Sequence, residues 1–138
     1  MMQEKAVSKA VRDLLRAFAD FPLRLTGIAA AGDPEERNGF SVFGVTEADV
    51  ALSIHMGRTV VYLCFEGEEE MDEEALVDLF QEAMERAMPH VRELVRLLPE
   101  KGGELLHDEM GPEMKEFIYG MLIKHLKGEN VYEQTEAA

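Results

Sequence analysis

The segment from residue 77 to residue 98 constrains the fold most, because it carries an apolar residue at every third or fourth position. These residues are Val77, Phe80, Met84, Ala87, Val91, Leu94 and Leu98. Such spacing predicts one long amphipathic α-helix whose apolar face must be shielded from water. Pro89 interrupts it, and an interior proline costs about 3 kcal/mol and bends a helix. Because the apolar stripe keeps its phase through Pro89, we predict one kinked helix rather than two helices.

The chain before this helix predicts a helix followed by a sheet. Apolar residues three and four apart indicate an amphipathic helix over residues 3–21, which Pro22 ends. Four short runs rich in β-branched and aromatic residues follow, separated by turn-forming residues, and they predict a three- to four-stranded antiparallel meander. The runs are Leu23 to Ala31, Phe40 to Thr46, Val50 to His55 and Thr59 to Phe65.

The chain after the long helix is predicted to be helical. Residues 104–110 are expected to hold a short helical stretch, and Pro112 opens a last amphipathic helix that Gly128 closes. The sequence therefore predicts an α+β fold: an N-terminal helix, the meander, the long kinked helix, and one or two C-terminal helices packed on one sheet face. Residues 1–128 are expected to form one domain, and residues 129–138 a flexible acidic tail.

The charge balance disfavours several classes of partner. The 138 residues include 28 acids and 14 bases, for a formal net charge of −14. Such a field repels nucleic acid and anionic lipid, so we expect neither a nucleic-acid nor a membrane partner. The one cysteine, Cys64, lies in an apolar run and predicts a buried, reduced thiol. Without a membrane-spanning run or a signal-peptide core, the expected location is the cytoplasm.

The most acidic stretch, EGEEEMDEEA at residues 66–75, predicts a helix entrance. Asp72 is placed to cap the long helix, and Glu73 and Glu74 then lie in the first turn, where the helix dipole favours negative charge. A calcium-binding loop needs alternating oxygen ligands around a central glycine, and this stretch has no such alternation. We therefore predict a hydrated connection rather than a cation site.

Metal and catalytic motifs are weak throughout the sequence. Glu104 and His107 have the Glu-x-x-His spacing of di-iron bundles, but those sites need a second such pair and two further carboxylates. A thiolate zinc site is excluded by the single cysteine, and a mid-strand Cys64 would be a poor nucleophile. We therefore nominate no catalytic residue, no metal ligand and no cofactor. Binding of a metal by Glu104 and His107 stays open, as does a catalytic pocket built from dispersed residues.

Methionines are the most suggestive residues of the later half. Methionine fills irregular gaps in cores, and it is also frequent on surfaces that accept varied apolar partners. We predict a non-catalytic protein-interaction module: an adaptor, a small chaperone or an assembly subunit. Its expected partner is another protein or peptide, and self-association through the long helix, as a dimer, is also expected. The candidate partner-binding residues are Met84, Met88, Met110, Met114 and Met121.

Two alternatives remain. The first is a small-molecule-binding domain or an enzyme with a pocket between sheet and helices, where His55 and Tyr62 are the polar residues of interest. The second is an acidic mimic of nucleic acid, which the bases interspersed on the same helices argue against.

Overall fold

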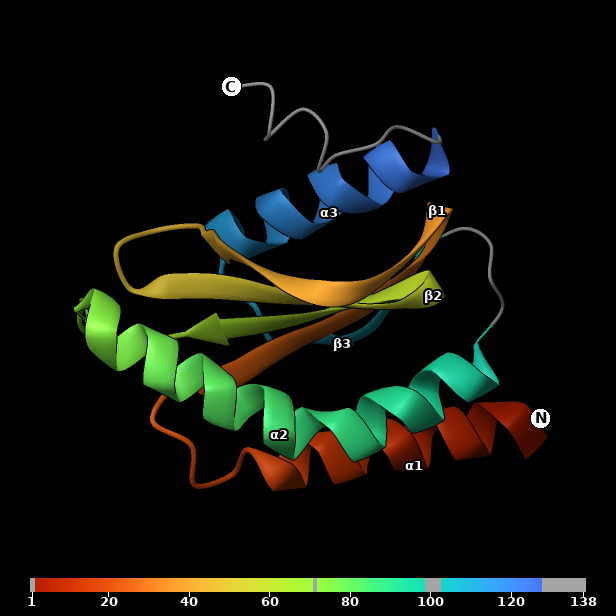
Figure 1. Cartoon of the computed structure of the whole chain (residues 1–138), viewed down its shortest axis with the longest axis horizontal. Coiled ribbons are helices and arrows are strands. Elements are labelled where there is room, and N and C mark those ends of the chain that lie inside the picture. The colour runs from red at the N-terminus through yellow and green to blue at the C-terminus, as the bar shows by residue number, and fades with distance from the viewer. Residues whose placement is uncertain (1, 71, 99–102, 128–138) are drawn as a thin grey trace.

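The computed structural model describes residues 2–70, 72–98 and 103–127, so the predicted tail at 129–138 lies outside the described residues. The elements are α1 (Met2–Ala17), β1 (Arg24–Gly44), β2 (Asp49–Glu66), α2 (Glu73–Leu97), β3 (Gly103–Asp108) and α3 (Pro112–Leu126). The α+β class is confirmed, with its N-terminal helix, antiparallel sheet, long helix and C-terminal helix (Figure 1).

The sheet is antiparallel, with the strand order β2-β1-β3. β1 and β2 pair along their whole length, but the register shifts between Gly32 and Arg37, where β1 holds four residues against the single Arg58 of β2. Both strands turn back there in Figure 1, so each supplies two segments to the sheet. The four predicted runs lie in these segments. Residues 32–39, which we expected to separate two strands, belong to β1, and residues 33–36 form an irregularity within it.

The segment after the long helix differs from the prediction. Residues 103–108 form β3, which pairs with Gly27–Ala31 of β1, and not the short helix that we expected. A six-residue segment has weak local preferences, and the free backbone groups of β1 offer it a full set of hydrogen bonds. This long-range pairing decides the conformation, and no local pattern reveals it.

The long helix is confirmed as one element, because α2 continues through Pro89. Its entrance is also as predicted: the backbone N–H of Ala75 donates to Asp72 Oδ1 at 2.8 Å. The apolar face of α2 is shielded from water except at its start, where Val77 is exposed. No helix in the described part of the chain is long and apolar enough to span a membrane.

The helices cover both faces of the sheet, whereas we predicted that they would pack on one. α1 and α2 lie against one face and α3 lies against the other (Figure 1). The cause is visible in β2, where Leu63 and Phe65 join the first core while Tyr62 and Cys64 join the second. Since neighbouring residues of a strand point to opposite faces, a strand that is apolar at every position needs cover on both.

The two cores differ in composition. The core under α1 and α2 holds an aromatic cluster in which the rings of Phe18 and Phe21 lie 5.2 and 5.5 Å from that of Phe65. The core under α3 is built from small strand residues and methionines. Met110 lies directly over Gly27, where an added Cβ would be 2.3 Å from the methionine sulfur. A side chain at position 27 would therefore displace Met110.

Candidate functional site

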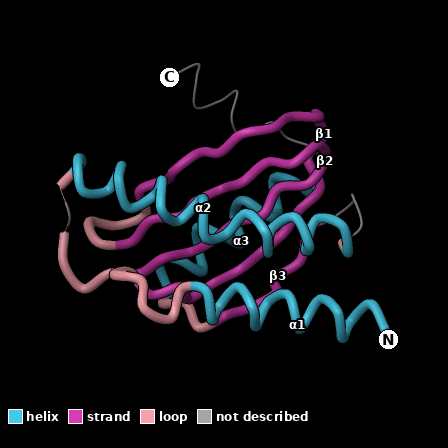
Figure 2. Tube along the Cα trace, turned by 60° about the horizontal axis from the view of Figure 1, so that its bottom comes forward, coloured by secondary structure: helices cyan, strands magenta, loops and turns pink. Residues whose placement is uncertain are grey.

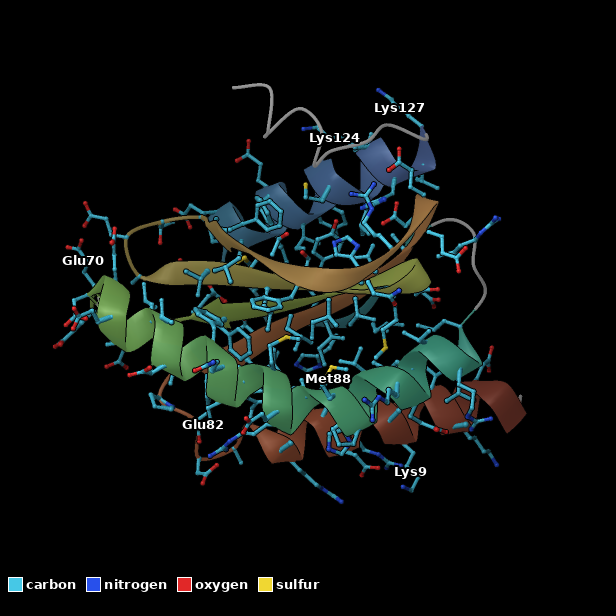
Figure 3. The ribbon with its side chains drawn as sticks, viewed as in Figure 1. Lys9, Glu70, Glu82, Met88, Lys124 and Lys127 are labelled. Atoms are coloured by element: carbon cyan, nitrogen blue, oxygen red, sulfur yellow. The ribbon has the colours of Figure 1, made fainter. Side chains whose placement is uncertain are left out.

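The five candidate methionines do not share one surface. Met110, Met114 and Met121 are buried in the core under α3. Met84 and Met88 are half-buried on α2 and pack against the core on the other side of the sheet, and Figure 3 shows Met88 between α2 and the strands. Their role in partner binding stays a prediction, but this placement provides no common methionine-lined groove.

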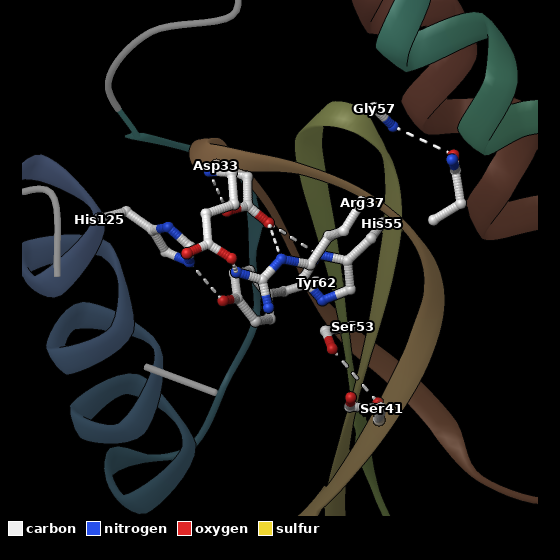
Figure 4. A network of polar contacts seen from close by, with 10 residues as sticks. Asp33, Arg37, Ser41, Ser53, His55, Gly57, Tyr62 and His125 are labelled. Carbon is white, nitrogen blue, oxygen red and sulfur yellow. Dashed lines mark hydrogen bonds and ion pairs between the residues drawn. The ribbon is translucent and has the colours of Figure 1, made fainter. Parts of the chain in front are cut away.

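His55 and Tyr62, the polar residues of the pocket hypothesis, belong to a buried polar cluster (Figure 4). His55 Nδ1 lies 3.1 Å from Asp33 Oδ2, and the exposed fractions of these two side chains are 4% and 1%. Arg37 Nε lies 3.0 Å from the same carboxylate oxygen. Asp33 lies in the irregularity of β1 and Arg37 directly follows it, so a local departure from regular pairing brings a buried acid and a half-buried base together.

The second part of the polar cluster joins the sheet to α3. The Tyr62 hydroxyl lies 2.7 Å from His125 Nε2, and both side chains are buried. A neutral imidazole donates at one ring nitrogen and accepts at the other, so the tautomer of His125 sets which of the two groups donates in this bond. His125 is in the last turn of α3, and this bond therefore fixes the end of that helix against β2.

Burial governs the ionisation of this cluster. Burial lowers the pKa of His55, and the Asp33 carboxylate only partly opposes this effect. Burial likewise lowers the pKa of His125, against the opposing influence of Asp33 and the Gly32 backbone. Both imidazoles are therefore neutral near pH 7. Burial also raises the pKa of the Cys64 thiol, which is consistent with the inert thiol that we predicted.

The polar cluster is largely buried within the fold. Its side chains line neither of the two cavities described below. Nor do the described residues bring together three or more His, Cys, Asp or Glu side chains in a group able to hold a metal ion. Glu104 and His107 lie on β3, not on a helix, and His107 Nε2 is 3.3 Å from Glu109 Oε1. The helical spacing that suggested a di-iron ligand pair is therefore absent.

A groove between α1, the end of α2 and β3 is the larger of the two cavities, with a volume of about 1330 Å³. Half-buried or buried leucines and valines from all three elements line it. They are Val7, Val11, Leu15, Leu97, Leu98, Leu105 and Leu106. We call this feature the α1–β3 groove. A smaller cavity of about 590 Å³ lies beyond the end of α1, where Phe18 and Phe21 meet the carboxylates of Glu66, Glu68 and Glu69.

One wall of the α1–β3 groove is an edge of the sheet. Among the described residues β3 pairs with β1 alone, so its other edge has no strand partner. Figure 2 shows β3 as the strand nearest α1. The backbone N–H and C=O groups of an unpaired edge can pair with an added strand. The groove thus combines apolar side chains with a strand edge that lacks a second strand among the residues that the structure describes.

Sequence reasoning missed three residues of the polar cluster: Asp33, Arg37 and His125. A weak signal existed for Asp33, since it directly follows a run of alanines and glycine that reads as buried strand. Arg37 stands four residues after it, but nothing local indicates that this segment folds inward. His125 stands in the last turn of α3, where the sequence indicates only the preference of the helix dipole for a cation.

Comparisons of this chain with protein-family models, with curated proteins and with solved structures find no match.

Proposed function

We propose that this chain is a non-catalytic protein-interaction module that binds an extended segment of a partner protein in the α1–β3 groove. One observation carries the proposal: an apolar groove lies beside the edge of β3 that has no strand partner in the described part of the chain. Backbone hydrogen bonds to such an edge supply affinity for an extended peptide, and pockets beside it select alternate side chains. This keeps the predicted function but moves its surface from the methionines to the groove.

The charges around the groove indicate what kind of segment it accepts. Its rim carries Lys5 and Arg12 from α1 together with Glu4 and Glu104, so acids and bases balance there. This balance contrasts with the net charge of −14 over the chain. A segment with apolar residues at every second position and neutral or mildly charged residues between them fits such a rim.

The test is selection of peptides from a phage-displayed library of short random sequences on the purified, immobilised chain. We expect enrichment of sequences that alternate apolar and polar residues. A Ser8→Trp substitution places a large side chain in the groove at an exposed position of α1. It is expected to weaken binding of the enriched peptides at least about tenfold, which is a loss of about 1.4 kcal/mol.

The matched control is Gln81→Trp, which makes the same change at an exposed position of α2 outside the groove. It should leave peptide binding unchanged. Selection that enriches no sequence over an empty surface, or enriched peptides that bind Ser8→Trp as tightly as the wild type, would contradict the proposal.

The other two hypotheses receive less support. An enzyme or small-molecule site around His55 and Tyr62 needs a cavity at the polar cluster, and neither described cavity reaches it. Nucleic-acid mimicry needs extended acidic faces, but α1 carries four bases and two acids.

A further inference from the structure

The outer face of α3 is apolar although it faces solvent. Tyr119, Ile123 and Leu126 follow each other at spacings of four and three, and 47%, 50% and 64% of their surfaces are exposed. The opposite side of α3, with Met114, Ile118 and Met121, already fills the core against the sheet. A helix that is apolar on both sides is normally covered on both sides. The outer stripe of α3 is thus an unpartnered surface in the described chain.

Gly120 lies on the outer side of α3, next to this apolar stripe, and has no packing role within the described chain. No atom lies within 4 Å of the position that a Cβ would take there. Glycine inside a helix is unfavourable relative to alanine, and this one relieves no contact. A glycine is useful at this place if another backbone approaches the helix closely.

Charges are arranged symmetrically about Gly120 with opposite signs. Glu116 and Lys124 stand four residues before and after it, and Glu113 and Lys127 stand seven residues before and after it. Residues at these spacings lie on the same side of a helix as the glycine. Figure 3 shows Lys124 and Lys127 extending from the outer side of α3. The four charges sum to zero on a chain whose net charge is −14.

We propose that α3 packs against α3 of a second copy of this chain, antiparallel, with the twofold axis close to Gly120. This arrangement places Glu116 opposite the partner's Lys124 and Glu113 opposite the partner's Lys127, each pair occurring twice. A parallel arrangement would instead oppose like charges. The glycine allows the two backbones to approach, and the apolar stripes cover each other. The interface lies across the sheet from the α1–β3 groove and does not depend on the proposed function.

Sedimentation velocity of the full chain over a range of concentrations tests this proposal. We expect a concentration-dependent dimer that a Gly120→Leu substitution weakens at least about tenfold, because leucine holds the two helices apart. The same substitution should raise the thermal midpoint of the dilute monomer, since leucine favours helix over glycine. Gln81→Leu on α2 is the control and should leave the dimer intact.

Exchanging the charges at positions 116 and 124 tests the antiparallel arrangement independently. Either Glu116→Lys or Lys124→Glu alone places like charges across the axis twice, and each is expected to weaken the dimer about tenfold. The double variant restores both pairs and should associate within about threefold of the wild type. A chain that stays monomeric at every accessible concentration would overturn the proposal. So would a dimer indifferent to Gly120→Leu, or a double variant no stronger than the single ones.

Discussion

The two faces of the sheet are covered in different ways. Two helices cover the first face, and their outward surfaces carry the charges that solvent requires: Lys9 pairs with Asp13 on α1, and Glu93 pairs with Arg96 on α2. A single helix, α3, covers the second face, and its outward surface carries an apolar stripe beside its charges. The outward surfaces of α1 and α2 therefore suit solvent, whereas the outward surface of α3 suits contact with a further helix. A sheet that is apolar on both faces can be closed by intramolecular packing on one and by association on the other.

The interiors of the two layers also differ. The first core is dominated by phenylalanines that contact edge to face, as Phe18 does with Phe65 at 5.2 Å. The second core combines flexible methionines with a buried Tyr62–His125 hydrogen bond. Methionine fills space without fixing one geometry, so a directional bond is what sets the position of α3. We infer that the first layer supplies most of the stability, and that the second depends on its polar contacts.

The largest predicted effect compares one deletion in each core. Phe65→Ala removes a fully buried ring and its aromatic contacts and should lower the free energy of unfolding by about 3–5 kcal/mol. Met114→Ala, equally buried in the second core, should cost less, about 2–3 kcal/mol, because neighbouring methionines can rearrange into the space. Urea denaturation of both variants measures the difference. Equal losses of unfolding free energy, or a larger loss for Met114→Ala, would contradict the inference that the core under α1 and α2 supplies most of the stability.

The second prediction concerns the bond that positions α3. Tyr62→Phe removes the hydroxyl at His125 Nε2 and leaves that buried nitrogen without this hydrogen-bond partner, at an expected cost of about 1–3 kcal/mol. Hydrogen exchange should show faster opening of the last turns of α3, with α2 unaffected. Leu94→Met, an apolar change in the core under α1 and α2, should lower the free energy of unfolding less. It should also leave the hydrogen exchange of the α3 amides unchanged. Uniform destabilisation of all helices by Tyr62→Phe would argue against a positioning role.

The third prediction is a pH dependence that belongs to the second layer. The pKa values of buried His55 and His125 are lowered, mainly by burial, so the unfolded chain binds more protons than the folded chain at mildly acidic pH. Stability is therefore full above the unfolded pKa of about 6.5 and is lost progressively as the pH falls below it.

Thermal unfolding between pH 7.5 and pH 5.5 measures this dependence. We expect His125→Gln to flatten the profile of midpoint against pH, while His90→Gln on α2, at a half-buried position, keeps the wild-type profile. A profile that both substitutions leave alike would place the pH dependence elsewhere in the chain.

The smallest predicted effect tests the start of α2. Asp72→Ala removes the side chain that accepts from the N–H of Ala75 and should cost about 1 kcal/mol in unfolding free energy. Asp72→Asn, which keeps an accepting oxygen, should retain most of this stability. α3 begins at Gly111 with no side-chain cap, so it has no equivalent residue to lose. If Asn and Ala proved equally destabilising at position 72, the negative charge and not the cap would be the cause.

Hydrophobic periodicity predicted the helices and strands whose conformation follows from the pattern of a single segment. The stripe from Phe80 to Leu94 identified α2 through Pro89, and the acidic stretch was correctly read as its capped entrance. The alternation from Val50 to His55 identified the first half of β2. These features follow from spacings that a single segment contains.

Long-range partners account for what the sequence did not reveal. β3 is a strand because β1 has a free edge, and the placement of α3 depends on which face of β2 remains open. The candidate site was missed for the same reason. Asp33 meets His55 only because β1 and β2 lose register together, and the α1–β3 groove forms from segments about 90 residues apart in the chain.

Hydrogen–deuterium exchange of α2 and α3 at low and high protein concentration tests the contrast between the two layers most directly. If the outer surface of α3, and not that of α2, contacts a second copy of the chain, amides of α3 around Gly120 should become more protected as concentration rises, while those of α2 stay the same. Protection of α3 that does not change with concentration, or that changes equally in α2, would contradict the account.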